Sequence, residues 1–195
     1  MGRGGPSQAG TGSFGADRLW ALALLLLLGL HGWFKWTWGT LPELLWACNI
    51  ASFATVLGLG FRSPAVTGMA LLWHLGIGEP AWLYEVVRTG HTHWVSVLVH
   101  TLPALAAFLS LRRTGLPRNA PWLALLMFAL LLPISLLTPP RLNINLAHQR
   151  PEILQRLLPG TWSYRLAFGA TVAGLLLLWD LALGRLLGRP GRLER

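Results

Sequence analysis

The chain has little charge, few acidic residues and a single cysteine. Of its 195 residues, 7 are Asp or Glu, 16 are Lys or Arg, and only 12% are charged. One cysteine excludes an intrachain disulfide and a metal site built from several cysteines. The scarcity of charge, combined with 53% hydrophobic residues and 11 tryptophans, is unlike the composition of a water-soluble domain. We therefore predict an integral membrane protein.

The formal net charge of +9 does not indicate a nucleic-acid-binding protein. The basic residues stand in short groups beside apolar runs, and such flanks orient membrane-spanning helices. We expect membrane lipids as partners, no nucleic acid and no cofactor. His91 and His93 form a His-x-His pair in a predicted outer loop. A zinc site would need two further ligands, so this pair alone is a weak indication of metal.

The apolar segments predict an all-α, polytopic membrane bundle of about six helices, because each crossing uses roughly 20 residues. They cover approximately residues 19–33, 41–61, 65–76, 94–111, 120–137 and 162–183. The domain plan is a disordered tail over residues 1–16, a transmembrane domain over 17–187 and a basic tail over 188–195. The third segment loses its apolar character at residues 76–80, so we expect it to be short or followed by a re-entrant segment.

The distribution of Lys and Arg predicts the orientation of the bundle. Under this plan about ten basic residues fall on the side of the termini and about six on the other side, which favours cytoplasmic termini. We expect a multi-pass protein of a bacterial cytoplasmic membrane. The N-terminal tail and the basic C-terminal tail then both lie on the inner side.

Most of the uncharacteristic polar residues fall in the outer half of the predicted spans. Polar side chains in lipid usually face a bundle interior or one another. Cys48 is about seven residues into the second span and His100 about six into the fourth, so both lie roughly 10 Å below the outer boundary. His74 reaches a similar level. An interfacial position explains His31, and a helix N-terminus explains Glu43.

A thiol beside an imidazole can act as a nucleophile towards an ester or thioester carbonyl. We interpret Cys48 as the candidate nucleophile and His100 as its general base, with Asn49 a possible donor to the oxyanion. Ser52 shares a helix face with Cys48, and His74 could line the same substrate pocket. Two alternatives stay open. A thiol in a span is often inert packing, and an intramembrane histidine can serve only a hydrogen bond between helices.

The connection Leu142–Glu152 is unusually rich in side-chain amides for a link between apolar spans. Asn143, Asn145 and His148, with Tyr164 just beyond, are candidate substrate-binding residues. An outer loop of this kind could cover a site or bind a lipid head group. The alternative is a solvated loop with asparagine turns.

Several short motifs together resemble the YwaF-like bacterial integral membrane proteins. They are Ala47–Asn49 (ACN), Glu79-Pro80, His100, and an Asn-rich stretch followed by Trp162 and Tyr164. That family is similar to an animal transmembrane acyltransferase of ether phospholipids and, more remotely, to androgen-induced membrane hydrolases that use Thr and His. The resemblance spans about residues 19–183. It implies that Cys48 is the nucleophile, His100 its partner, and Asn143 and Asn145 the loop motif.

These observations lead to two functional hypotheses. The first is an enzyme that transfers or hydrolyses lipid acyl chains at a Cys48/His100 site in the outer leaflet. The second is a non-catalytic transporter, lipid-binding protein or assembly subunit. A continuous polar path to the inner face would favour the second. The inner halves of the spans are nearly all apolar, with Asp180 the main exception, so the sequence favours a pocket open to one side.

Overall fold

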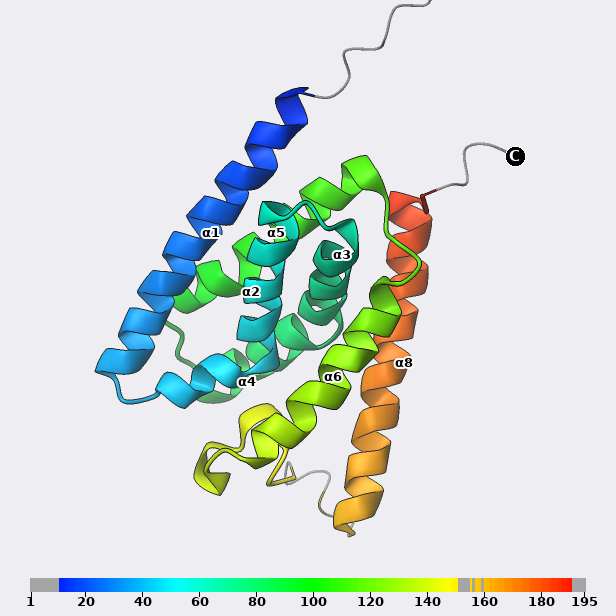
Figure 1. The fold of residues 1–195 in the computed structure, drawn as a ribbon. Helices are drawn as coiled ribbons and strands as arrows, with labels where there is room; N and C mark the ends of the chain where they lie inside the picture. Colours follow the sequence, from blue (N-terminus) through cyan, green and yellow to red (C-terminus); the bar gives the residue numbers. More distant parts are fainter. Residues whose placement is uncertain (1–10, 151–154, 156, 159, 191–195) are drawn as a thin grey trace, which may run out of the picture.

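The computed structural model describes residues 11–150, 155, 157–158 and 160–190, and every regular element in them is helical. Figure 1 shows that the start of the first helix and the end of the last lie at one end of the bundle, which we call the terminal end. The opposite end, which we call the far end, holds residues 38–46, 74–93 and 137–150. The helices are α1 (Thr11–Thr37), α2 (Ala47–Gly60), α3 (Pro64–Trp73), α4 (Glu79–Thr89), α5 (Trp94–Thr114), α6 (Ala120–Leu136) and α8 (Thr161–Leu187).

Three helices are long and apolar enough to cross a membrane. They are residues Gly15–Thr37 of α1, the whole of α5 and the whole of α8. Helices α2 and α6 are apolar but shorter. Leucines stand exposed along the outer faces of the long helices, among them Leu22, Leu26, Leu178 and Leu181. Such faces are expected where lipid replaces water around a bundle.

The first helix begins earlier than the sequence predicts. Residues 11–16 were expected to belong to a disordered tail, but α1 starts at Thr11. The carboxylate of Asp17 accepts hydrogen bonds from Arg113 and Ser110 of α5, which fixes this end of α1 against its neighbour. The rest of the predicted N-terminal tail, residues 1–10, lies outside the described residues, as do residues 191–195 of the C-terminal tail.

The second apolar segment is divided into two helical pieces. A 3-10 turn, η1, covers Leu41–Leu45, and the backbone of Trp46 (φ −58°, ψ 138°) leaves the helical conformation before α2 begins at Ala47. Pro42 lies in the first turn of η1, where its missing N–H group is tolerated. The helix that carries Cys48 is therefore 14 residues long instead of about twenty.

The third segment is a short helix that continues through a π-helical turn. After the ten residues of α3, the turn η2 covers His74–Gly78 and leads into α4 without a break in helical backbone. Pro80, which cannot donate a backbone hydrogen bond, lies in the first turn of α4. The expected loss of apolar character thus marks a π turn, a feature that is frequent at functional sites.

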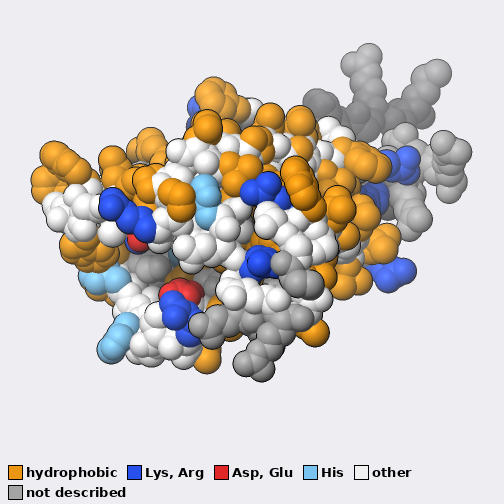
Figure 2. All heavy atoms as spheres, turned by 90° about the horizontal axis from the view of Figure 1, so that it is seen from below, with side chains coloured by type: hydrophobic (Ala, Val, Ile, Leu, Met, Phe, Trp, Pro, Cys, Tyr) orange, Lys and Arg blue, Asp and Glu red, His pale blue; other side chains and the backbone are white. Residues whose placement is uncertain are grey.

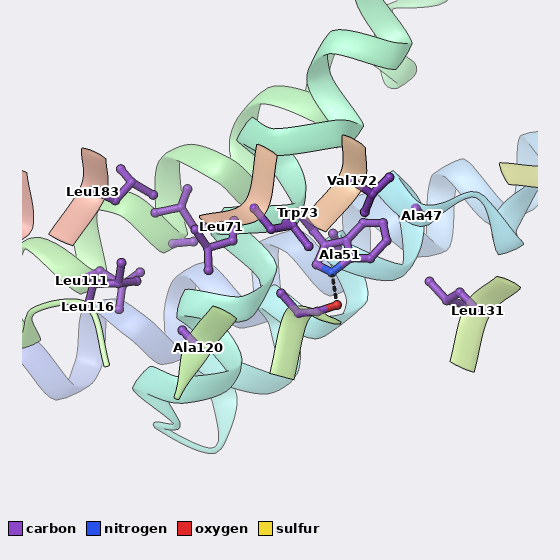
Figure 3. Packing of buried hydrophobic residues seen from close by; sticks show 14 residues of the cluster. Ala47, Ala51, Leu71, Trp73, Leu111, Leu116, Ala120, Leu131, Val172 and Leu183 are labelled. Atoms are coloured by element: carbon purple, nitrogen blue, oxygen red, sulfur yellow. Dashed lines mark hydrogen bonds between the residues drawn. The ribbon is translucent and has the colours of Figure 1, made fainter. Parts of the chain in front are cut away.

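The core of the bundle is packed around Trp73. Its indole Nε1 donates a hydrogen bond of 3.0 Å to the carbonyl oxygen of Ala124 in α6, as Figure 3 shows. Small residues such as Ala51 and Ala120 are fully buried in the same cluster. Small side chains let membrane helices approach closely, so the core relies on fit between helices.

Asp180, the polar exception in the inner halves of the spans, has a structural partner. Its carboxylate accepts a 2.6 Å hydrogen bond from Arg189. Arg189 also donates to the carbonyl oxygens of Asp180 and Pro117. The chain folds back after Gly188, which ends α8 with a positive φ of 76° and brings Arg189 over the last turns of the helix.

Candidate functional site

Charged and histidine side chains gather at the far end of the bundle. Figure 2 views this end and shows basic, acidic and histidine side chains on its face, together with hydrophobic ones. Lys35 of α1 and Glu43 of η1 form an ion pair of 2.5 Å, and Glu85 and Arg88 of α4 form another of 2.5 Å. The candidate site lies at this end, opposite the start of α1 and the end of α8.

Cys48 is the second residue of α2 and is partly exposed. A Cβ atom added at Gly78 would lie 3.2 Å from the Cβ of Cys48. The π turn therefore packs its backbone directly against the thiol-bearing residue, an approach that the glycine allows.

The same π turn holds a buried histidine-carboxylate pair. The Nδ1 atom of His74 is 2.9 Å from Oε1 of Glu79, and His74 is 0% exposed. A carboxylate partner favours the tautomer that carries its proton on Nδ1, which leaves Nε2 as an acceptor. That Nε2 atom is buried and has no hydrogen-bond partner among the described residues. The sequence predicts Glu79 only as part of a helix break. His74 and Glu79 are five residues apart, and residues at this spacing do not share a face of an α-helix.

His100 belongs to the same group of side chains. Its Nδ1 donates a 2.7 Å hydrogen bond to the carbonyl oxygen of Ser96, and its ring stacks on Trp82 of α4 at 4.8 Å. This hydrogen bond leaves the lone pair on Nε2. The charges of Glu79 and His74 act on His100 through space, and that of Glu79 acts on Cys48, while among the described residues no hydrogen bond or ion pair joins His100 to Cys48. We call Cys48, His74, Glu79 and His100 the polar cluster.

Asn49 and Ser52 hold the start of α2 in place. The Nδ2 of Asn49 donates a 2.9 Å hydrogen bond to the carbonyl oxygen of Glu43, so the donor expected for an oxyanion is already engaged. Its buried Oδ1 has no hydrogen-bond partner within the described part of the chain. The hydroxyl of Ser52 lies 3.0 Å from the carbonyl oxygen of Cys48 and 3.1 Å from that of Val99. Ser52 thus joins α2 to α5 beside the polar cluster.

Asn145, from the loop after α6, caps the helix that carries Cys48. Its Oδ1 accepts a 2.7 Å hydrogen bond from the backbone N–H of Ala47. Its Nδ2 donates to the carbonyl oxygen of Leu45 at 3.0 Å and to the hydroxyl of Ser135 at 2.8 Å. Both the oxygen and the nitrogen of the Asn145 amide are thus engaged. Asn145 is a positioning residue, because it holds Ala47, the residue directly before Cys48.

The other loop candidates fasten the loop to itself and to its neighbours. The Oδ1 of Asn143 accepts hydrogen bonds from the backbone N–H groups of His148 and Gln149, at 3.0 and 2.7 Å. The ring of His148 contacts the carbonyl oxygen of Ser135 at 3.1 Å. Tyr164 of α8 donates a 3.2 Å hydrogen bond to the carbonyl oxygen of Leu146. This loop is held by specific hydrogen bonds.

We expect substitution of Asn145 by alanine to destabilise the protein by about 2–3 kcal/mol. The change removes a cap from the N–H of Ala47 and leaves several part-buried groups without their partner. The apparent Tm of the purified full chain in detergent measures the effect. Asn119→Ala is the matched control, because Asn119 precedes α6 and makes no side-chain cap. Equal Tm values for the two variants would contradict the capping role.

Two cavities lie outside the polar cluster, since none of its four residues lines either of them. One of about 270 Å³ is lined by residues that include His148, Arg150, Tyr164 and Arg165. A shallower one of about 340 Å³ is lined by residues of α1 and η1 that include Trp33 and Trp36. Within the described part of the chain, no group of three or more His, Cys, Asp or Glu side chains could hold a metal ion.

Comparisons with protein-family models, with curated proteins and with solved structures each found no match.

Proposed function

We propose that the chain crosses a bacterial cytoplasmic membrane about six times, through α1, α2, α3, α5, α6 and α8. These helices alternate in direction between the terminal end and the far end in Figure 1. The shorter helices cross together with their flanking turns η1 and η2. We place the terminal end in the cytoplasm, because its basic residues outnumber those of the far end. They include Arg18, Arg62, Arg112, Arg113, Arg118 and Arg185.

On this topology, we propose that the protein transfers or hydrolyses lipid acyl chains at the polar cluster. The observation that carries the proposal is the packing of Cys48 against the π turn that begins at His74, beside Glu79, with His100 under the electrostatic influence of the His74–Glu79 pair. Thiol-based acyl transfer needs a thiol and a general base such as an imidazole with an acceptor nitrogen, and the polar cluster contains both. The resemblance to YwaF-like proteins points to the same chemistry.

In the proposed reaction, Nε2 of His100 removes the proton of the Cys48 thiol as the sulfur attacks the carbonyl carbon of a lipid ester. The carbonyl oxygen takes up the negative charge, and the N–H groups at the start of α2 stabilise it. The alcohol then leaves with the proton from His100, and a thioester remains on Cys48. Water or a second alcohol attacks this thioester, so the acyl chain leaves and the thiol is restored.

The test is the intact mass of the full chain in detergent after incubation with phospholipid. We expect the mass to increase by one acyl chain and to return after treatment with hydroxylamine, which cleaves thioesters. Because the chain has 1 cysteine, such an adduct can lie only on Cys48. A protein that consumes lipid without this adduct, or whose adduct resists hydroxylamine, would contradict the proposal.

A second candidate is a non-catalytic lipid-binding protein. The position of the 270 Å³ cavity favours it, because that cavity is separate from Cys48 and is lined by polar side chains. If the protein only binds lipid, we expect lipid to copurify with the chain and to stay intact. The same mass measurement separates the two, since binding without reaction leaves no covalent adduct.

A further inference from the structure

The 270 Å³ cavity lies at the far end between the loop that follows η4 (Ile144–Leu146) and the first turn of α8. Arg150 and Arg165 contribute two guanidinium groups to its wall, and the described residues that line it include no carboxylate. Gln149, Thr161 and Tyr164 add further hydrogen-bonding groups. The cavity therefore offers positive charge and donors to a small ligand.

Arg165 is held in place but has unused hydrogen-bonding capacity. Its guanidinium carbon lies 5.4 Å from the centre of the Trp162 ring. Its Nε atom is buried and has no partner among the described residues, although a buried donor without a partner is costly. Arg150 donates one hydrogen bond to the carbonyl oxygen of Leu158 and has further N–H groups. An anionic acceptor in the cavity would give partners to the remaining N–H groups of both guanidinium groups.

The start of α8 adds to this positive potential. Thr161 is the first residue of a helix of 27 residues, and the preceding Gly160 offers no side-chain cap. The first N–H groups of a helix have no partner within the helix and favour an anion. Thr161 lines the cavity, so the helix end and the two arginines converge on one space.

The walls are fixed before any ligand binds. Asn143 bonds the backbone N–H groups of His148 and Gln149, and Tyr164 bonds the carbonyl oxygen of Leu146. Gln155 donates a 3.0 Å hydrogen bond to the carbonyl oxygen of Arg150. A site whose walls are already ordered loses less conformational entropy on binding.

We propose that this cavity binds the phosphate group of a ligand, with Arg165 and Arg150 as donors. The planar guanidinium of arginine donates two parallel hydrogen bonds to phosphate oxygens, a geometry that suits this anion. A phospholipid head group and free phosphate share this chemistry. The choice of a lipid source rests on the proposed membrane-lipid function, whereas the phosphate site itself does not depend on catalysis.

The test is native mass spectrometry of the full chain in detergent with three probes: phosphatidic acid, the matching diacylglycerol and inorganic phosphate. We expect Arg165→Gln to weaken binding of phosphatidic acid about tenfold, the equivalent of about 1.4 kcal/mol. Arg141→Gln is the matched control, because Arg141 is exposed on the same loop and does not line the cavity. We expect it to change binding less than twofold and diacylglycerol to bind weakly to every variant.

Equal losses in Arg165→Gln and Arg141→Gln, or equal affinities for phosphatidic acid and diacylglycerol, would overturn the phosphate site. Tighter binding of phosphatidic acid than of inorganic phosphate supports a head group as the source. The reverse order, with the same loss in Arg165→Gln, supports free phosphate. Cys48→Ala is expected to retain phosphatidic acid binding. A chain that forms no acyl adduct but shows the Arg165 effect therefore refutes the catalytic proposal alone.

Discussion

Substitution of Cys48 by alanine is expected to abolish the acyl adduct and to lower lipid turnover about 10³-fold or more. Cys48 supplies the only thiol of the chain, and no second nucleophile replaces it in the polar cluster. Turnover is measured by release of radiolabelled fatty acid or by its transfer to a second lipid. Because Cys48 is partly exposed at the start of α2, the variant is expected to keep an apparent Tm close to that of the wild type. Activity above about a tenth of the wild-type value would exclude the thiol as nucleophile.

The role of His100 is tested against that of Glu79. Loss of a general base costs about 10²–10⁴-fold in rate, so His100→Gln is expected to show a loss in this range. Glu79→Gln keeps a hydrogen bond to His74 but removes the negative charge that both imidazoles face. We therefore expect a smaller loss, with a change in the pH profile of turnover. If the larger loss follows Glu79→Gln, the base is His74.

The largest structural effect is expected from Gly58→Ala. A Cβ atom at this position would lie 2.4 Å from Oγ1 and 2.7 Å from the backbone N of Thr67. The clash is with backbone, so α2 and α3 must move apart, at a cost of about 3 kcal/mol or more. The apparent Tm and the yield of monodisperse protein in size-exclusion chromatography measure it.

Gly174→Ala is the matched control for this substitution. Gly174 lies within α8, and an added Cβ there meets nothing within 4 Å. Alanine is the better helix former by about 1 kcal/mol, so this variant is expected to be as stable as the wild type or more stable. Similar behaviour of the Gly58 and Gly174 variants would show that close contact between α2 and α3 is not needed.

The sequence could predict an all-helical membrane protein, because the length of an apolar segment decides whether it can span a membrane. This length depends only on residues that are neighbours in the chain. The all-helical prediction is confirmed for the described residues, and three helices reach the length and hydropathy of membrane spans. The boundaries of the second segment were wrong, because the cap of α2 comes from Asn145, 98 residues away from Ala47. No local pattern contains that information. The number of crossings and their orientation stay predictions.

The candidate site stays a prediction, and the structure adds one residue to it. Depth counting placed Cys48, His74 and His100 at one level, and in the structure Glu79 contacts His74 at 2.9 Å. Glu79 itself was missed, because its contact with His74 depends on a π turn. A side-chain amide can form hydrogen bonds to a ligand or to the backbone. The sequence therefore could not show which of these partners Asn143 and Asn145 bind. Their hydrogen bonds here go to backbone and to Ser135.

The Asn145 cap also sets the order in which the protein can be completed during synthesis. When Ala47 is joined to the growing chain, its future partner is still 98 residues from being made. Helix α2 therefore receives its final cap only after α6 and the loop that follows it have been translated and brought beside it. Until then, the geometry around Cys48 is unfinished. The thiol acquires its final surroundings late, after most of the chain has been produced.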